Sequence, residues 1–257
     1  MSSNDSIKKI ITVAFALCIV CSVVVSTAAV LLKPAQEANR DLDRKRNILQ
    51  AAGMLEEGKS VEELFERIEA RFVDLRTGAF AEDVPPGYNQ RKASKNPQLS
   101  TDLKGSEDRA GIGRQAHFAE VYLVEAVDGS GLDKIILPVH GYGLWSTLYG
   151  FVALESDADT IAGLGFYEHG ETPGLGGEVD NPRWKAQWPG KRVYRDGDVA
   201  IGLAKGSVDS SSPDAEWRVD GLSGATLTSR GVTDLVQFWL GERGFKPFLN
   251  NLKTGDV

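Results

Sequence analysis

The sequence predicts an α+β protein in which a single N-terminal transmembrane helix precedes a domain with an antiparallel sheet flanked by helices. Three observations support this fold class: an uncharged apolar run near the N-terminus, a series of short strand-like runs with short connections, and amphipathic helical stretches on both sides of those runs. Of the 257 residues, 42% are hydrophobic, which is enough apolar material for one or two packed domains.

The apolar run extends from Ile10 to Leu32 and contains 23 residues without a charge, whereas a membrane-spanning helix needs about 20. We therefore expect residues 10–32 to span a bilayer, after a short cytoplasmic tail of residues 1–9. A cleavable signal peptide is the alternative, because Lys8 and Lys9 precede the run and small residues lie near its end. The run is longer than the usual apolar segment of a signal peptide, about 7 to 15 residues, which favours an uncleaved anchor.

The charges beside the apolar run do not settle its orientation. Four basic residues within positions 40–46 outnumber Lys8 and Lys9, and this excess alone would keep the following domain in the cytoplasm. A large domain behind a short tail can nevertheless be exported.

Composition and cysteine usage exclude several classes of protein. Lys and Arg total 29 against 36 Asp and Glu, so the chain lacks the basic balance that binding to a phosphate backbone needs, and no nucleic-acid partner is expected. Cys18 and Cys21 lie inside the apolar run, where cysteine packs as a small hydrophobe. The rest of the chain therefore offers no disulfide and no cysteine nucleophile, and we predict no metal site.

Residues 33–115 are expected to form a helical stalk followed by a long loop region. The stalk ends near Gly53 or Gly58. A second helix should follow, because Ser60 and Glu63 have the spacing of a capping box and apolar residues recur at helical spacing from Val61 to Phe72.

Residues 116–257 are expected to form the main domain, after a polar loop at 83–115. Its strand-like runs are 120–127, 134–139, 148–155 and 160–167, with weaker ones at 192–194, 199–203 and 217–219. The short connections between the first four runs predict that these pair antiparallel. A final helix should run from about Ala225 to Glu242, with Leu227 on its buried side.

The most informative motif is DGLSGATLTS, from Asp220 to Ser229, which lies between a strand-like run and the final helix. A helix start presents free N–H groups and the positive end of the helix dipole, which suits a phosphate. The plainer interpretation is a glycine turn with a helix cap formed by Ser223 or Thr226. A hydrolase nucleophile at Ser223 is disfavoured, because no histidine follows it in the chain.

The stretch from Asp220 to Thr226 resembles the D-x-x-S-G-A-T flavinylation motif of FMN-binding domains. The motifs HGYGLWS, at residues 140–146, and ETPGLGG, at residues 171–177, precede it in the order found in one family, to which the whole chain is similar. That family comprises the C subunits of the bacterial Na+-translocating NADH:quinone reductases. The G subunit of the related Rnf complex shares the threonine motif, but it is generally shorter.

The resemblance implies a membrane-anchored flavoprotein subunit that relays electrons through FMN, covalently attached by a phosphoester bond to Thr226. Its implied partners are the other subunits of the reductase, the membrane, and a flavin transferase for maturation. The implied location is the bacterial inner membrane, with the FMN domain on the periplasmic side. The chain would be an electron-transfer subunit without its own NADH site and without a catalytic side chain.

The resemblance also implies the FMN contacts. They fall in the three motifs: Thr226 with Ser223, Gly224, Ala225, Leu227 and Thr228; Glu171, Thr172, Gly174 and Leu175; and Leu144 and Trp145. Core packing is an equal alternative for Trp145, and a structural role is the alternative for His140 and His169. Three further classes of function remain open: an Rnf-type subunit, a stand-alone extracytoplasmic FMN protein, and an anchored binding or sensor domain without flavin.

Overall fold

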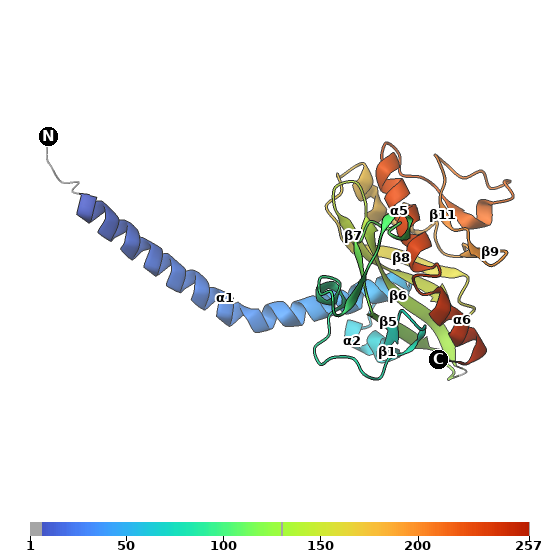
Figure 1. The fold of residues 1–257 in the computed structure, drawn as a ribbon, viewed down its shortest axis with the longest axis horizontal. Helices are drawn as coiled ribbons and strands as arrows, with labels where there is room; N and C mark the ends of the chain where they lie inside the picture. The colour runs from blue at the N-terminus through green and yellow to red at the C-terminus, as the bar shows by residue number, and fades with distance from the viewer. Residues whose placement is uncertain (1–6, 130, 257) are drawn as a thin grey trace. The chain divides into compact units, whose positions relative to one another are not determined.

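The computed structural model describes residues 7–129 and 131–256. Contacts divide the chain into an N-terminal unit that ends at Arg44 and a compact unit that begins at Lys45. Helix α1, Ile7–Ala51, contains the whole predicted span and ends close to Gly53, as expected for the stalk (Figure 1). Its apolar side chains up to Leu32 are exposed. Among the helices of the described residues, α1 is the one that is long and apolar enough to cross a membrane.

A six-stranded sheet organises the compact unit, in the order β2-β1-β5-β6-β7-β8. Its strands are β1 Ile68–Asp74, β2 Ala79–Phe80, β5 Phe118–Glu125, β6 Leu132–Tyr142, β7 Thr147–Glu155 and β8 Ile161–Glu168. Every neighbouring pair is antiparallel, which confirms the four predicted strands and their pairing. Because β1 and β2 come from the segment expected to be stalk and loop, the compact unit starts well before residue 116.

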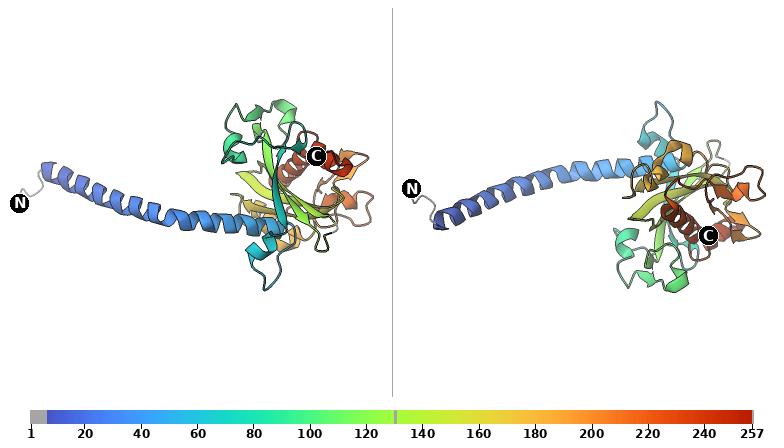
Figure 2. Two further views of the ribbon diagram at one scale, coloured as in Figure 1. Left: turned by 90° about the horizontal axis from the view of Figure 1, so that it is seen from below. Right: turned by 90° about the horizontal axis from the view of Figure 1, so that it is seen from above.

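Alternation along the central strands divides the core into two layers. Figure 2 gives two further views of the sheet that separates them. On β6, Ile135 and Leu137 belong to the larger apolar cluster, which includes residues of α5, Thr226–Trp239. Ile136 lies on the other face, in a smaller cluster with Ile48 of α1. Successive strand residues point to opposite faces, so one sheet buries two sets of apolar side chains.

The prediction of a second helix from Val61 to Phe72 is mostly wrong. Helix α2 covers only Val61–Phe65, and residues 68–74 form β1 instead. The Ser60 cap is present, since its hydroxyl accepts a 3.2 Å hydrogen bond from the Glu63 amide. Beyond it, β1 pairs with β5 along its full length. Its β-branched and aromatic residues also suit a pleated surface, so pairing in the sheet overrides the helical spacing.

The remaining elements are short. They are α3 Gln90–Ala93, β3 Ser100–Asp102, η1 Gly105–Glu107, β4 Arg114–Ala116, η2 Gly176–Asp180, α4 Pro182–Lys185, β9 Tyr194–Arg195, β10 Asp198–Val199, β11 Gly202–Leu203, η3 Ala215–Trp217 and β12 Arg218–Val219. The loop predicted at 83–115 therefore contains a small antiparallel β3–β4 pair.

The C-terminus differs from the prediction in two ways. Helix α5 ends at Trp239, before the expected Glu242, and a further helix, α6, covers Lys246–Thr254. Phe248 and Leu249 of α6 are fully buried, so this short helix is stabilised by packing on the core rather than by a long amphipathic pattern.

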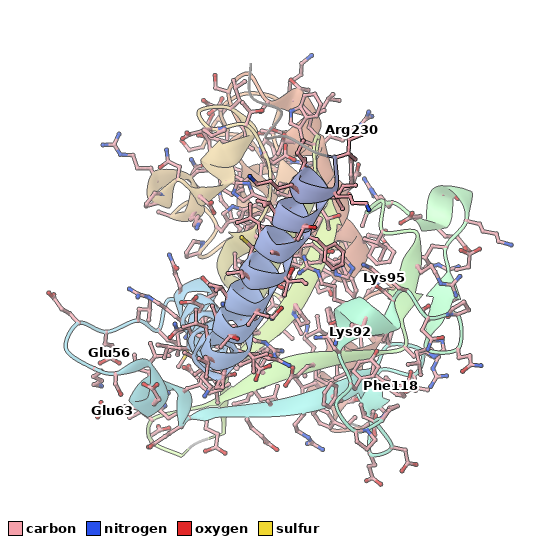
Figure 3. All side chains as sticks on the ribbon, turned by 90° about the vertical axis from the view of Figure 1, so that its left-hand side faces the viewer. Glu56, Glu63, Lys92, Lys95, Phe118 and Arg230 are labelled. Carbon is pink, nitrogen blue, oxygen red and sulfur yellow. The ribbon has the colours of Figure 1, made fainter. Side chains whose placement is uncertain are left out.

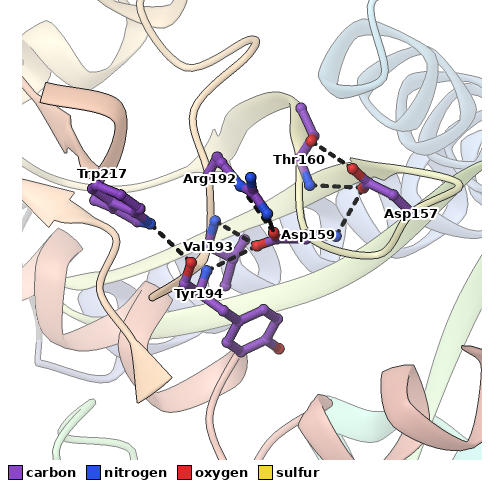
Figure 4. Close-up of polar contacts among 7 residues, drawn as sticks. All are labelled: Asp157, Asp159, Thr160, Arg192, Val193, Tyr194 and Trp217. Carbon is purple, nitrogen blue, oxygen red and sulfur yellow. Dashed lines mark hydrogen bonds and ion pairs between the residues drawn. The ribbon is translucent and has the colours of Figure 1, made fainter. Parts of the chain in front are cut away.

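A polar cluster joins the turn after β7 to the segment before β9 (Figure 4). Asp159 accepts hydrogen bonds from the backbone amides of Val193, at 3.2 Å, and Tyr194, at 2.9 Å, and pairs with the guanidinium of Arg192. Asp157 in turn accepts from the Asp159 amide. The buried Asp159 carboxylate is thus fully partnered and holds two distant segments together.

Candidate functional site

The DGLSGATLTS motif forms a tight turn between β12 and α5. Gly224 has φ +70°, in the left-handed region that glycine adopts without strain. A Cβ at Gly224 would lie 2.9 Å from Cδ2 of Leu175. The turn therefore lies against Leu175 of the ETPGLGG motif.

The start of α5 has no side-chain cap, so the predicted cap by Ser223 or Thr226 is wrong. Ala225 is the N-cap residue, and the Ser229 amide donates to its carbonyl at 2.9 Å. The Ser229 hydroxyl is used elsewhere, because it accepts from the Leu222 amide. The backbone N–H groups of residues 226–228 therefore have no acceptor within the helix and suit an anion.

Thr226 and Thr228 have opposite environments. Thr226 is exposed at the first position of α5. Thr228 is fully buried, and its Oγ1 donates a 2.7 Å hydrogen bond to Oε2 of Glu171. Of these two hydroxyl-bearing residues, only Thr226 is exposed.

Glu171 connects the three sequence motifs. Its Oε1 accepts hydrogen bonds from the backbone amides of Leu144, Trp145 and Ser146, at 3.0 to 3.2 Å, while Oε2 accepts from Thr228. A Cβ at Gly176 would lie 2.6 Å from the Thr228 hydroxyl oxygen, so glycine is required for this close approach. The buried carboxylate thereby holds HGYGLWS, ETPGLGG and SGATLTS in one place.

The charge of Glu171 is stabilised despite its burial. Burial raises the pKa of this carboxyl, but the Thr228 hydroxyl and the three backbone amides together outweigh burial and hold the pKa below its usual range. A carboxylate with several donors remains ionised. Glu171 therefore acts as a structural acceptor and not as a proton donor at neutral pH.

Exposed apolar side chains lie in the three motifs that Glu171 holds together. Trp145 is 66% exposed, Leu227 55% and Leu175 44%. The prediction that Leu227 packs on the buried side of the last helix is therefore wrong, and core packing of Trp145 is excluded. Thr172 and Gly174 are also exposed, whereas Leu144 is half-buried. Such a surface beside an accessible hydroxyl fits a cofactor with a flat apolar ring.

His140, in the HGYGLWS motif, and His169, just before ETPGLGG, have structural surroundings. The His140 ring packs against Tyr149 and Trp239, with centroids 5.5 and 4.9 Å away. Burial, with a smaller effect of the Arg91 charge, lowers the pKa of His140 from 6.5 to about 4. His169 accepts from the Glu171 amide through Nδ1, at 3.2 Å, so Nε2 carries the proton that it donates to Asp180, at 2.7 Å.

An open hollow of about 590 Å³ lies next to this centre. It is lined by Arg91, Lys95, Ser146, Thr147, Tyr149, Glu168, His169 and Gly170. Ser146 links the hollow to Glu171, because its amide donates to the Glu171 carboxylate. Its hydroxyl accepts a 2.6 Å hydrogen bond from the amide of Gly170, which also lines the hollow. Arg91 comes from the loop region far away in sequence, and no motif could have placed it here. Among the described residues no group of three metal-ligating side chains occurs.

Comparisons with known proteins agree with this geometry. Residues 143–241 match the family model of the FMN-binding domain. Over its full length the chain is 54% identical to the C subunit of the Na+-translocating NADH-quinone reductase of Pseudomonas aeruginosa, covering all of that protein. It is 50% identical to the C subunit of the Vibrio anguillarum enzyme, covering 99% of it.

Two solved structures are similar as well. Shewanella oneidensis NqrC matches 82% of this chain and 97% of its own, with 38% identity and a TM-score of 0.75. The C subunit of the Na+-translocating NADH-quinone reductase from Parabacteroides distasonis matches 85% of this chain and 96% of its own, with 28% identity and a TM-score of 0.65.

The fold and site thus define a membrane-anchored flavoprotein with an FMN-binding domain. Within that class, the full-length similarity shows that the chain belongs to the family of the Na+-translocating NADH-quinone reductase C subunits. The resemblance stated from the motifs is confirmed. The Rnf-type, stand-alone and flavin-free sensor alternatives are displaced by this assignment.

Proposed function

We propose that the chain relays electrons within a Na+-translocating NADH:quinone reductase through FMN joined by a phosphoester bond to Thr226. The observation that carries this proposal is the contrast between two neighbouring hydroxyls. Thr226 is exposed at the uncapped start of α5, whereas Thr228 is buried and bonded to Glu171. The motif and the geometry therefore favour the same oxygen.

The residues present fit this cofactor. The amides of residues 226–228 would face the phosphoester, and the exposed Leu175, Leu227 and Trp145 would cover parts of the flavin ring. Ser223, Gly224 and Ala225 would shape the turn, with Glu171, Thr172, Gly174 and Leu144 forming the neighbouring walls. Bound FMN supplies a carrier that accepts electrons from one centre and passes them to the next.

Attachment would need a separate flavin transferase. A threonine hydroxyl is a weak nucleophile unless a base activates it, and among the described residues no side chain is hydrogen-bonded to Thr226. Thr226 is therefore an acceptor that an external enzyme modifies. The partners proposed for the mature protein are the other reductase subunits, which would supply NADH oxidation, the quinone site and the ion path.

Peptide mass spectrometry tests the attachment. Protein made with an active flavin transferase should carry FMN on the peptide that contains Thr226 and show flavin fluorescence in a denaturing gel. Thr226→Ala should lose both signals while keeping the melting temperature of the unmodified parent. Thr228→Ser, which retains the buried hydroxyl, is the matched control and should keep them. An unmodified Thr226 in the parent protein would refute the proposal.

We also propose that α1 anchors the chain in the bacterial inner membrane with the FMN domain on the periplasmic side. The exposed apolar surface of α1 supports the anchor, and family membership together with the short N-terminal tail supports the side. A C-terminal fusion to alkaline phosphatase, which is active only after export, should be active. A fusion after residue 9 is the inactive control, and a stable but inactive full-length fusion would reverse the orientation.

A further inference from the structure

Arg230, labelled in Figure 3, is an exposed arginine. In the sequence of α5 it follows Thr226 by one helical turn. Resting on the FMN attachment proposed above, we propose that the guanidinium of Arg230 binds the phosphodiester formed between FMN and Thr226. Arg230 would then be a positioning residue, which neutralises the single negative charge of the linkage and fixes its orientation along α5.

The first argument is placement. Of the residues of α5, all of which the structure describes, only Thr226, Leu227 and Arg230 are exposed. Residues four apart lie on the same helix face, with Cβ atoms about 5 to 6 Å apart. Helical side chains lean toward the N-terminus. A side chain as long as that of Arg230 can therefore reach the turn that carries Thr226.

The second argument is that Arg230 lacks a counter-ion. Asp234, one turn further along α5, is the acidic residue at ion-pairing spacing, but its Oδ1 accepts a 2.7 Å hydrogen bond from Nε of Arg109. Among the described residues, no ion pair, hydrogen bond or ring contact involves the side chain of Arg230. Within that part of the chain, the fold thus leaves a cation unpaired beside Thr226.

The third argument is electrostatic. The N-terminal end of a helix carries a partial positive charge, and cations near it are unfavourable unless an anion is also present. Here an unpaired cation lies one helical turn after a helix start that has no side-chain cap. An anion at Thr226 would stabilise both groups. The planar guanidinium presents parallel donors that match two phosphate oxygens, a geometry that lysine cannot reproduce.

Phosphorus NMR of the flavinylated full-length chain in detergent tests the inference. The phosphodiester resonance of the parent should move when the protein is denatured. In native Arg230→Gln it should already lie near the denatured position, while Arg230→Lys should keep part of the parent shift. Arg46→Gln, which changes an exposed arginine outside α5, should match the parent.

A second readout is the gain in melting temperature on flavinylation, measured against the unmodified form of each variant. Arg230→Gln should lose most of the gain. In the parent the gain should shrink as salt is raised, because ions screen an exposed pair.

The possible failures are distinguishable. If mass spectrometry finds no FMN on Thr226 of the parent, the proposed function fails and this inference with it. If FMN is on Thr226 but the native resonance of Arg230→Gln equals that of the parent, or the parent resonance does not move on denaturation, only the role of Arg230 is overturned. Loss of FMN from both Arg230→Gln and Arg230→Lys would overturn it as well, because a retained positive charge should still bind the phosphodiester.

Discussion

Thr228 and Glu171 join two sequence motifs 57 positions apart through one hydrogen bond of 2.7 Å, from the threonine Oγ1 to the carboxylate Oε2. Both side chains are buried. The second carboxylate oxygen accepts three backbone amides of the HGYGLWS segment. The conformation of the proposed flavin site therefore depends on a buried carboxylate that contributes no chemistry of its own.

Replacing Glu171 should damage this site in a graded way. Glu171→Ala leaves three amides and the Thr228 hydroxyl without a partner, which should lower the free energy of unfolding by about 2 to 4 kcal/mol. Glu171→Gln keeps an acceptor oxygen and should lower the free energy of unfolding by less than half as much. Chemical denaturation measures both. Equal stability of Glu171→Ala and the parent would show that the carboxylate does not hold the segments together.

Acid should destabilise the domain through His140. Because burial lowers its pKa from 6.5 to about 4, neutral His140 stabilises the fold fully above pH 6.5, and this contribution is lost as the pH falls toward 4. The loss should be at most about 3 kcal/mol.

Thermal melts of the parent and His140→Gln from pH 7 to pH 4 measure this effect. The variant should show a shallower decline, with the remaining slope including His117, whose pKa burial also lowers. Parallel curves for the two proteins would contradict the assignment to His140.

Leu175→Ala should alter the flavin without releasing it. Leu175 is 44% exposed and lies against Gly224 at the start of α5. Truncation should cost less than the roughly 2 to 5 kcal/mol of a buried leucine. It should also open one side of the ring to water, so we expect unchanged flavin content with a shifted absorption spectrum and slower electron transfer in the assembled complex. An unaltered spectrum and transfer rate would show that Leu175 does not contact the ring and would indicate that the ring packs against the HGYGLWS motif instead.

Asp159→Ala should destabilise the domain without affecting FMN attachment. The change removes the acceptor of the Tyr194 amide (Figure 4), whereas the Val193 amide keeps its 2.9 Å hydrogen bond to the Asp159 carbonyl oxygen. An unsatisfied donor costs about 1 to 3 kcal/mol. Asp159→Asn retains one acceptor oxygen and should be milder. The expected result is a lower denaturation midpoint with full gel fluorescence. A parent-like midpoint would mean that water replaces the carboxylate.

Several features of this protein follow from the sequence alone. The apolar helix over residues 10–32 is evident because an uncharged run of that length suits a helix in lipid. The four central strands and the last helix follow from local apolar periodicity. Thr226 follows from a contiguous motif, so no long-range information was needed to single it out.

Only the tertiary structure decided the features that depend on distant partners. Residues 68–74 carry a helical spacing, but pairing with β5 makes them a strand. Leu227 follows the pattern of a buried residue and is exposed, because the sheet covers a different face of α5. Thr226 and Thr228 differ in burial, which the sequence does not show. Their difference arises from Glu171, whose position beside α5 is fixed by contacts between segments that the chain order does not reveal.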